Sequence, residues 1–130
     1  MSEKIKRLGD AELEIMLVIW GSSVPVTSNY IHEHLKKSRN WALSTLMTTL
    51  ERLVQKGFIY CDRSTRTNYY SAVIAEQSYK VHVGRSLLER LFGDSVQNLV
   101  TSLYDSKNMT NEDIHTLKEY LDELERKGDK

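Results

Sequence analysis

The sequence predicts a mainly helical protein with one small β-hairpin, in the order three helices, hairpin, three helices. Apolar residues recur every three to four positions through most of the chain, which is typical of amphipathic helices. Two short runs rich in aromatic and β-branched residues, 58–63 and 68–73, flank a polar loop and predict the hairpin. Glycines at 21, 57 and 93 follow helical runs and are expected to end them.

Composition excludes several classes of protein. The chain has 130 residues with 18 basic and 18 acidic side chains, which allows one medium domain or a small domain with an appended unit. Its one cysteine, Cys61, excludes an intrachain disulfide framework and fits a reducing compartment. The sequence has no signal-peptide pattern and no apolar run of membrane-spanning length. We therefore expect a cytoplasmic protein without membrane insertion.

The first two helices are expected on either side of a short extended segment. The first helix runs from Asp10, its expected N-cap, to Trp20. Its apolar face comprises Leu13, Met16, Leu17 and Trp20, widened by Ile15, Val18 and Ile19. The chain's only proline, at position 25, allows at most an edge strand over 24–26. Thr27 is the expected N-cap of the second helix, which runs from residue 28 to about 37 and directs Ile31 and Leu35 inward.

The stretch from Asn40 to Gly57 is expected to be the third helix, around which the rest of the chain is organised. Turning each residue by about 100° gives one apolar stripe and one polar face. The predicted core stripe comprises Leu43, Leu46, Met47, Leu50, Leu53 and Val54. The outward face comprises Ser44, Thr45, Thr48, Arg52 and Gln55, with Glu51 at its flank.

This outward face suits the DNA major groove, because hydroxyls can contact phosphates and base edges and arginine can donate two hydrogen bonds to guanine. An ordinary solvated helix is the alternative. Two helices joined by a short loop match a helix-turn-helix, and the hairpin that follows carries Arg63 and Arg66 at its tip. A basic hairpin tip alone is more often a solvated turn. After a helix-turn-helix it predicts the wing of a winged helix-turn-helix, whose arginines reach phosphates or a minor groove.

Charge is distributed unevenly along the chain. Residues 1–74 hold ten basic and seven acidic side chains, whereas residues 75–130 hold eight and eleven. The clustered basic residues of the first half are Lys36, Lys37, Arg39, Arg52, Lys56, Arg63 and Arg66. They predict a modest electrostatic footprint for binding nucleic acid.

Residues 75–130 are predicted to form three amphipathic helices. They are expected over 75–92, from a cap at Asp94 or Ser95 to about residue 104, and after a capping box at Thr110–Asp113. Such short helices must either fold back on the first domain or pair with a second chain. We expect a DNA-binding domain over 1–74 and a dimerisation domain over 75–130, because operators are commonly two-fold symmetric. The expected dimerisation residues are Leu87, Leu88, Leu91, Leu99, Val100, Leu103, Ile114, Leu117, Leu121 and Leu124.

A resemblance to a known family rests on LGDAELEIMLVIW, NWALSTLMTTLERLVQKGFI and NYYSAVI, in that order and spacing. These segments resemble the penicillinase-repressor family, the BlaI/MecI/CopY repressors. The likeness continues through LLERLFGDSVQNLVTSLYD and TNEDIHTLKEYLDEL and covers nearly the whole chain. It implies a homodimeric winged-helix repressor that binds pseudo-palindromic operators with TACA and TGTA half-sites, upstream of resistance or metal-homeostasis genes. We expect no enzymatic activity and no cofactor.

The resemblance also implies roles for particular residues. Positions used at the operator in the family are matched by Trp41, Thr45, Thr48 and Arg52. The chain departs from its relatives at Ser44, where many have lysine, and at Leu43, where penicillinase repressors have proline. The copper-responsive branch has a C-terminal pair of Cys-x-Cys motifs that this sequence lacks, which favours an antibiotic-responsive or uncharacterised branch.

In the penicillinase repressors, a membrane sensor protease switched on by a β-lactam leads to a cut in the helix that matches residues 95–104. Aligned on LVTSLYD, the cut would fall between Ser102 and Leu103, where the relatives have Asn-Phe. A sensor protease is therefore an expected partner, beside operator DNA and a second copy of the chain.

Other chemistry is not supported by the sequence. His32 and His34 lie two apart on a predicted helix and are expected to be surface residues rather than metal ligands. Cys61 is expected to be a small buried residue in a strand. No nucleophile, phosphate-loop or zinc-protease motif is present. Two function classes remain: a dimeric transcriptional repressor, which we favour, and a winged-helix protein-interaction module. Steep weakening with salt would identify DNA binding.

Overall fold

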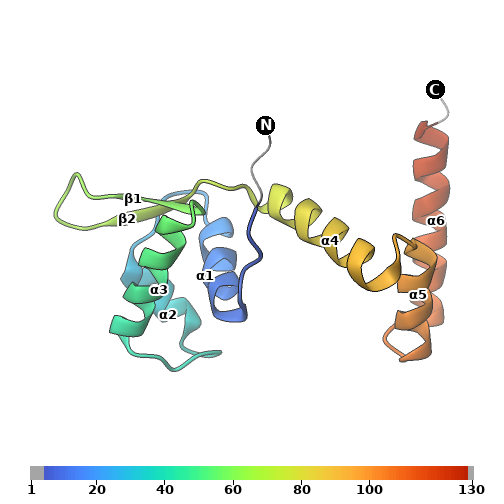
Figure 1. Ribbon diagram of the computed structural model, residues 1–130, viewed down its shortest axis with the longest axis horizontal. Helices are drawn as coiled ribbons and strands as arrows, with labels where there is room; N and C mark the ends of the chain where they lie inside the picture. The colour runs from blue at the N-terminus through green and yellow to red at the C-terminus, as the bar shows by residue number, and fades with distance from the viewer. Residues whose placement is uncertain (1–4, 129–130) are drawn as a thin grey trace. The chain divides into compact units, whose positions relative to one another are not determined.

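The computed structural model describes residues 5–128, which contain six helices and one two-stranded sheet (Figure 1). In chain order the elements are α1 (Asp10–Trp20), α2 (Ser28–Leu35), α3 (Leu43–Gln55), β1 (Ile59–Asp62), β2 (Tyr69–Ala72), α4 (Glu76–Phe92), α5 (Val96–Asp105) and α6 (Asn111–Gly128). The predicted fold class and order of elements are confirmed.

The chain divides into two compact units, one through Val83 and one from Gly84 onward. We call them the winged unit and the helical unit. The predicted boundary lay after residue 74, but the first turns of α4 pack into the winged unit through Tyr79. The Tyr79 hydroxyl accepts a hydrogen bond from the Leu8 N–H at 2.8 Å, and its ring meets that of Phe58 edge-on with centroids 5.8 Å apart. The first part of α4 is therefore a structural part of the winged unit.

One apolar core holds the winged unit together. α1, α2 and α3 pack against one another, and the hairpin packs against α1 and α3 (Figure 1). The largest fully buried side chains are Ile15, Met16, Ile31, Leu46, Leu50, Leu53 and Phe58. The Trp20 indole N–H donates to the Ile74 carbonyl at 2.9 Å and fastens the end of α1 to the chain beyond the hairpin. Removal of these side chains from water is the main force that holds α3 in place.

α1 differs from its prediction at two points. Its N-cap is Gly9 rather than Asp10, and the Glu12 carboxylate accepts a hydrogen bond from the Gly9 N–H at 3.0 Å. Glu12 thus satisfies one free donor at the start of the helix. The predicted apolar face was wrong at Leu17, which is 48% exposed, whereas Ile15 is fully buried. The buried apolar residues of α1 are Ile15, Met16 and Ile19, of which Met16 belonged to the predicted face and the other two were expected only to widen it.

The segment between α1 and α2 behaves as predicted. Val26 forms an isolated antiparallel bridge with Tyr70, with N–H to O distances of 2.9 and 2.7 Å, so it is a minimal edge strand. Thr27 is the N-cap of α2, and its hydroxyl accepts a hydrogen bond from the Tyr30 N–H at 3.1 Å. α2 ends at Leu35, slightly before the predicted position.

The hairpin is shorter than the two predicted runs but keeps their pairing. β1 and β2 are antiparallel, with Cys61 opposite Tyr70, and both of these side chains are buried. Burial of Cys61 was predicted. At the end of β1, Asp62 accepts a hydrogen bond from the Ser64 N–H at 2.9 Å, and hydrogen bonding from Ser64 lowers the pKa of Asp62. This contact shapes the start of the tip loop that carries Arg66.

The helical unit has well-formed helix ends but no core of its own within the residues described. The Ser95 hydroxyl accepts a hydrogen bond from the Asn98 N–H at 3.0 Å and caps α5. Thr110 and Asp113 cap α6 reciprocally at 2.9 and 3.0 Å, which confirms the predicted capping box. None of the residues 84–128 is buried. Side-chain caps define the starts of α5 and α6, but within a single chain the apolar sides of the helices stay partly exposed.

Candidate nucleic-acid interface

α3 is rotated relative to its predicted orientation. Its buried residues are Leu46, Thr49, Leu50 and Leu53. Leu43 and Met47, which had been placed in the core stripe, are 41% and 36% exposed. Thr49 was missed because it is polar, but its hydroxyl donates to the Thr45 carbonyl at 3.0 Å and is satisfied within the helix. At about 100° a residue, the buried arc lies about 50° from the predicted stripe.

The rotation places Glu51 within the outward face of α3. The exposed residues of that face are Ser44, Thr45, Met47, Thr48, Glu51, Arg52 and Gln55. All five predicted outward residues are among them, but Met47 was expected in the core stripe and Glu51 only at the flank. A threonine in a helix can be buried when its hydroxyl donates to a carbonyl of the same helix, as Thr49 does. Counting Thr49 as a core residue would have predicted the exposure of Met47 and the outward position of Glu51. A shallow hollow on this face is lined by Met47, Thr48, Glu51, Arg52 and Gln55.

Trp41 lies before α3, which begins at Leu43 rather than at Asn40. Its side chain is half-buried and packs against the core of the winged unit. The Trp41 carbonyl oxygen lies 2.9 Å from Nε2 of His32, and the Arg39 guanidinium lies 5.7 Å from the indole ring centroid. His32 is therefore half-buried and holds the loop before α3, rather than being a plain surface residue. A role of Trp41 at DNA stays a prediction.

The hairpin brings an arginine to the outward face of α3. Nη2 of Arg63 lies 3.4 Å from Oε1 of Glu51, and both side chains are a little over half exposed. Arg66 is also exposed and lies in the tip loop between the two strands. In Figure 1 the hairpin extends past α3 within the winged unit. The two predicted wing arginines thus differ in surroundings, since Arg63 contacts Glu51 of α3 and Arg66 lies in the tip loop.

An ion pair anchors the far end of α3 to α1. Nζ of Lys56 lies 2.9 and 2.8 Å from the two carboxylate oxygens of Glu12, which is only 7% exposed. Burial acts to raise the pKa of Glu12, but the hydrogen bonds from Lys56 and from the Gly9 N–H outweigh it, so the pKa lies below its ordinary value. The contact fixes the C-terminal end of α3 against the start of α1.

Ion pairs with carboxylates reduce the number of basic side chains that are available to bind nucleic acid. Lys56 is directed toward Glu12, Arg39 pairs with Glu14 at 3.0 Å, and Lys36 pairs with a carboxylate of its own helix. Three of the seven clustered basic residues therefore have carboxylate partners away from the outward face of α3. The positive charge that remains near this face comes mainly from Arg52 and the hairpin.

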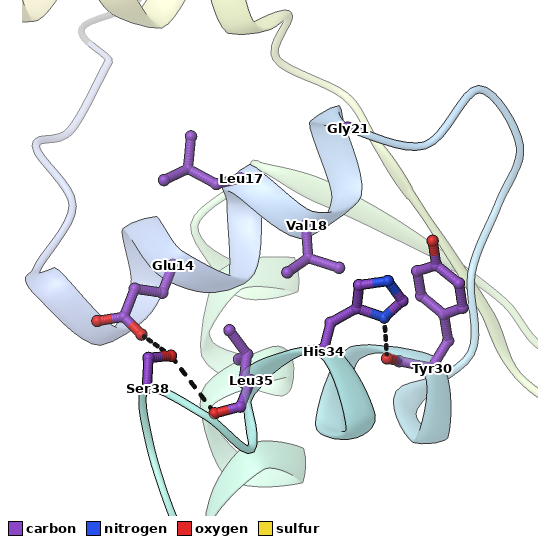
Figure 2. A pocket seen from close by; sticks show the side chains of 8 residues that line it. All are labelled: Glu14, Leu17, Val18, Gly21, Tyr30, His34, Leu35 and Ser38. Carbon is purple, nitrogen blue, oxygen red and sulfur yellow. Dashed lines mark hydrogen bonds between the residues drawn. The ribbon is translucent and has the colours of Figure 1, made fainter.

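A second hollow, of about 460 Å³, lies between α1 and α2 (Figure 2). Its lining residues are Glu14, Leu17, Val18, Gly21, Tyr30, His34, Leu35 and Ser38. Three of its polar side chains already have partners, because Ser38 donates to Glu14 at 3.2 Å and Nδ1 of His34 lies 3.0 Å from the Tyr30 carbonyl oxygen. The geometry therefore does not mark it as a reaction site.

The described part of the chain offers no metal site by geometry. Within residues 5–128, no three histidine, cysteine, aspartate or glutamate side chains gather as metal ligands would. No helix in that range is both long and apolar enough to span a bilayer.

The predicted dimerisation residues are all exposed or half-buried within one chain. Those with high exposure are Leu87, Leu91, Leu103, Ile114, Leu121 and Leu124, and those half-buried are Leu88, Leu99, Val100 and Leu117. Ser102 and Leu103, the expected cleavage position, lie exposed on α5. Whether these residues dimerise or are cut stays a prediction.

Comparison with known proteins identifies the family. A family model described as penicillinase repressor matches residues 8–123. The penicillinase repressor of Bacillus licheniformis is 31% identical over 121 residues, covering 93% of this chain and 94% of the relative. The penicillinase repressor of Staphylococcus aureus is 27% identical over 127 residues, covering 98% and 100%. The methicillin resistance regulatory protein MecI of Mammaliicoccus sciuri is 24% identical over 121 residues, covering 93% and 98%.

Solved structures agree with this assignment. The solution structure of the monomeric form of Bacillus licheniformis BlaI in complex with the blaP half-operator aligns at 37% identity and a TM-score of 0.50, covering 58% of this chain and 92% of that one. The DNA-binding domain of the repressor BlaI aligns at 36% identity and a TM-score of 0.51, covering 60% and 94%. The chain therefore belongs to the penicillinase-repressor family, a family of transcriptional repressors rather than enzymes.

Proposed function

We propose that this chain is a homodimeric, sequence-specific DNA-binding repressor whose α3 and hairpin contact operator DNA. The observation that carries the proposal is the outward face of α3, where hydroxyl, amide and guanidinium groups are exposed beside an arginine of the hairpin. The structure of a relative, BlaI, with half-operator DNA supports this use of the winged unit. The expected operators are pseudo-palindromes with TACA and TGTA half-sites, next to β-lactam-resistance or related stress genes.

Each exposed residue of the interface has a chemical role in this proposal. The hydroxyls of Ser44, Thr45 and Thr48 serve phosphates and base edges at the N-terminal half of α3. Arg52 reaches a guanine edge or a phosphate, and the Gln55 amide offers both a donor and an acceptor. The hairpin residues Arg63 and Arg66 contact phosphates or a minor groove. Trp41, which precedes α3, contacts the operator in this proposal, as the matching position does in the family.

The helical unit is the proposed dimerisation region. Its apolar residues lie on helices whose ends are well capped, yet none of the residues 84–128 is buried in one chain. Exposed leucines such as Leu91, at 68%, and Leu121, at 51%, leave apolar area that a second copy can cover. A two-fold dimer then presents two α3 helices to two half-sites.

The test of operator binding is Arg52→Ala. If Arg52 reads a base, the substitution costs roughly 1–3 kcal/mol of operator affinity and relaxes preference at one position. Fluorescence anisotropy with a duplex carrying TACA and TGTA half-sites, repeated over a range of salt concentrations, measures both effects. Arg90→Ala on α4 is the matched control, since it removes an exposed arginine outside the proposed interface. Unchanged operator affinity in Arg52→Ala would overturn the assignment.

The alternative is a winged-helix module that binds a protein partner through the same face. Phosphate contacts release counterions, so DNA affinity falls steeply as salt rises, whereas an interface dominated by apolar contacts is much less sensitive. A duplex affinity that hardly changes between low and high salt would favour the alternative.

Release from DNA is proposed to follow cleavage between Ser102 and Leu103 by a β-lactam sensor protease. The bond lies inside α5, so the helix must open before it can be cut. Within one chain no residue of this unit is buried, so the dimer contacts are the main interactions that oppose such local unfolding. The cut separates the winged unit from α6 and part of the dimer surface.

Immunoblotting and mass spectrometry after β-lactam exposure of the native host should detect a fragment ending at Ser102. Derepression with only full-length protein present would point to another inducer.

A further inference from the structure

We propose that Glu51 is a specificity-determining residue that accepts a hydrogen bond from the exocyclic amino group of a cytosine in the major groove, with Arg63 balancing its charge. The inference rests on the proposed DNA-binding function and adds a base-reading role for a carboxylate. The helical wheel from the sequence had placed Glu51 at the flank of α3. The structure places it among the residues most directly opposed to the buried side.

The position of Glu51 on α3 supports direct access to a base. Glu51 follows Thr48 by three residues and precedes Gln55 by four, so the three side chains share one face of the helix. All three are exposed, and with Arg52 and Met47 they line the shallow hollow on the outward face. A helix that enters the major groove with Thr48 and Gln55 toward the bases therefore brings the Glu51 carboxylate to the same depth.

The charge of Glu51 makes this position selective. A carboxylate brought up to DNA is repelled by the phosphates, so it weakens binding to every duplex unless a base compensates it. In the major groove only cytosine N4 and adenine N6 carry amino donors, and an acidic side chain pairs with cytosine N4. The carboxylate thus lowers affinity for DNA sites that lack a cytosine opposite Glu51.

Arg63 lowers the cost of placing a carboxylate on this surface. Its Nη2 lies 3.4 Å from Oε1 of Glu51, and the pair is more than half exposed on both sides. An exposed pair of this kind contributes little to folding stability, so its main effect is on local charge and on where the side chain points. One carboxylate oxygen is occupied by the hairpin arginine, and the second stays available for an amino donor.

The experiment is selection of bound sequences from a random duplex library with the full-length chain. Wild type, Glu51→Ala and Glu51→Gln are compared, with Glu76→Gln as the control. Glu76 pairs with Lys80 on α4, also at 3.4 Å, so its substitution removes a solvent-accessible, paired carboxylate away from α3. We expect Glu51→Ala to lose preference for cytosine at one base pair of each half-site by about five- to a hundredfold. Glu51→Gln should move that preference to adenine, because glutamine pairs bidentately with adenine N6 and N7.

A second arm separates base reading from an effect of the hairpin. In an Arg63→Ala background, the loss of cytosine preference on Glu51→Ala should persist. Disappearance of that loss would mean that Glu51 acts only through the hairpin, and would overturn the inference. Identical selected sequences for wild type and Glu51→Ala would also overturn it while leaving the repressor proposal intact. Selection of no sequence by wild type would overturn the repressor proposal itself.

Discussion

The winged unit and the helical unit are both built from amphipathic helices with well-formed ends, but within residues 5–128 only the winged unit buries its apolar residues. Thr27 of the winged unit and Thr110 of the helical unit each accept a hydrogen bond from an N–H three residues later. Leu50 in α3 is fully buried, whereas Leu121 in α6 is 51% exposed. The difference indicates that caps and periodicity define helices locally, and that a core decides whether a unit is stable alone.

The contrast has a functional consequence. A unit with its own core can present α3 and the hairpin in a fixed geometry, which base recognition requires. A unit without one gains stability only when a second surface covers it, so its folding and its association are coupled. Under the proposed function, DNA recognition lies in the winged unit, and the helical unit controls that recognition through dimerisation.

Separation of the two units should give the largest effect. A chain ending at Val83 retains Tyr79 and should fold as a monomer. Its affinity for a full operator should fall from the specific range of about 10⁻⁸–10⁻¹¹ M toward the non-specific range of about 10⁻⁴–10⁻⁶ M, because each monomer holds one half-site. Analytical ultracentrifugation and gel shifts measure the two changes. A shortened chain that remained a tight dimer would place the dimer surface in the winged unit.

The position of the truncation also tests the boundary. A chain ending at Val73 lacks Tyr79, and with it the hydrogen bond from the Leu8 N–H and the ring contact with Phe58. Loss of a buried aromatic side chain costs about 3–5 kcal/mol. This shorter chain should therefore melt well below the one ending at Val83. Equal melting temperatures would show that α4 contributes nothing to the winged unit.

A matched pair of leucine substitutions tests which unit has a core. Leu50→Ala should lower the free energy of unfolding of the winged unit by about 2–5 kcal/mol, because it empties a fully buried site. Leu121→Ala should leave that unfolding transition unchanged and raise the dimer dissociation constant instead. Thermal unfolding by circular dichroism and sedimentation equilibrium separate the two effects. A large loss of winged-unit stability in Leu121→Ala would mean that the two units share a core.

Sequence reasoning predicted the fold better than the interface. Element order, the hairpin and the caps at Thr27 and Thr110 follow from local signals and are confirmed. The rotation of α3 could not be predicted from hydrophobicity alone, because Thr49 buries a hydroxyl that its own helix satisfies. The Glu51–Arg63 contact depends on how the hairpin returns past α3, which residues 58–73 do not specify locally. Five residues of the outward face of α3 could therefore be predicted from the sequence, whereas the exposure of Met47 and the place of Glu51 on that face required tertiary structure. That the face binds DNA stays a prediction.

The ion pair between Glu12 and Lys56 gives the winged unit a response to acid. Because the pKa of folded Glu12 lies below its ordinary value of 4.5, its contribution to stability is complete above about pH 4.5 and is lost as pH falls through the folded pKa. Lys56→Met should cost at most about 3 kcal/mol at neutral pH, since it leaves a buried carboxylate unpaired. Its cost should shrink below pH 4.5, where Glu12 takes up a proton. Urea unfolding at a series of pH values measures this, and a cost independent of pH would exclude the mechanism.

The smallest effect compares the two threonine caps directly. Thr27→Ala and Thr110→Ala remove the same side-chain acceptor, and loss of such a cap typically costs about 1 kcal/mol. In the winged unit the cost should appear in global unfolding, because α2 is joined to the others by the shared core. In the helical unit it should appear as faster amide hydrogen exchange in the first turn of α6, with the melting of the winged unit unchanged. If Thr110→Ala lowered that melting temperature as much as Thr27→Ala does, the two units would unfold as one. The distinction between a unit stable alone and a unit completed by a partner would then have to be abandoned.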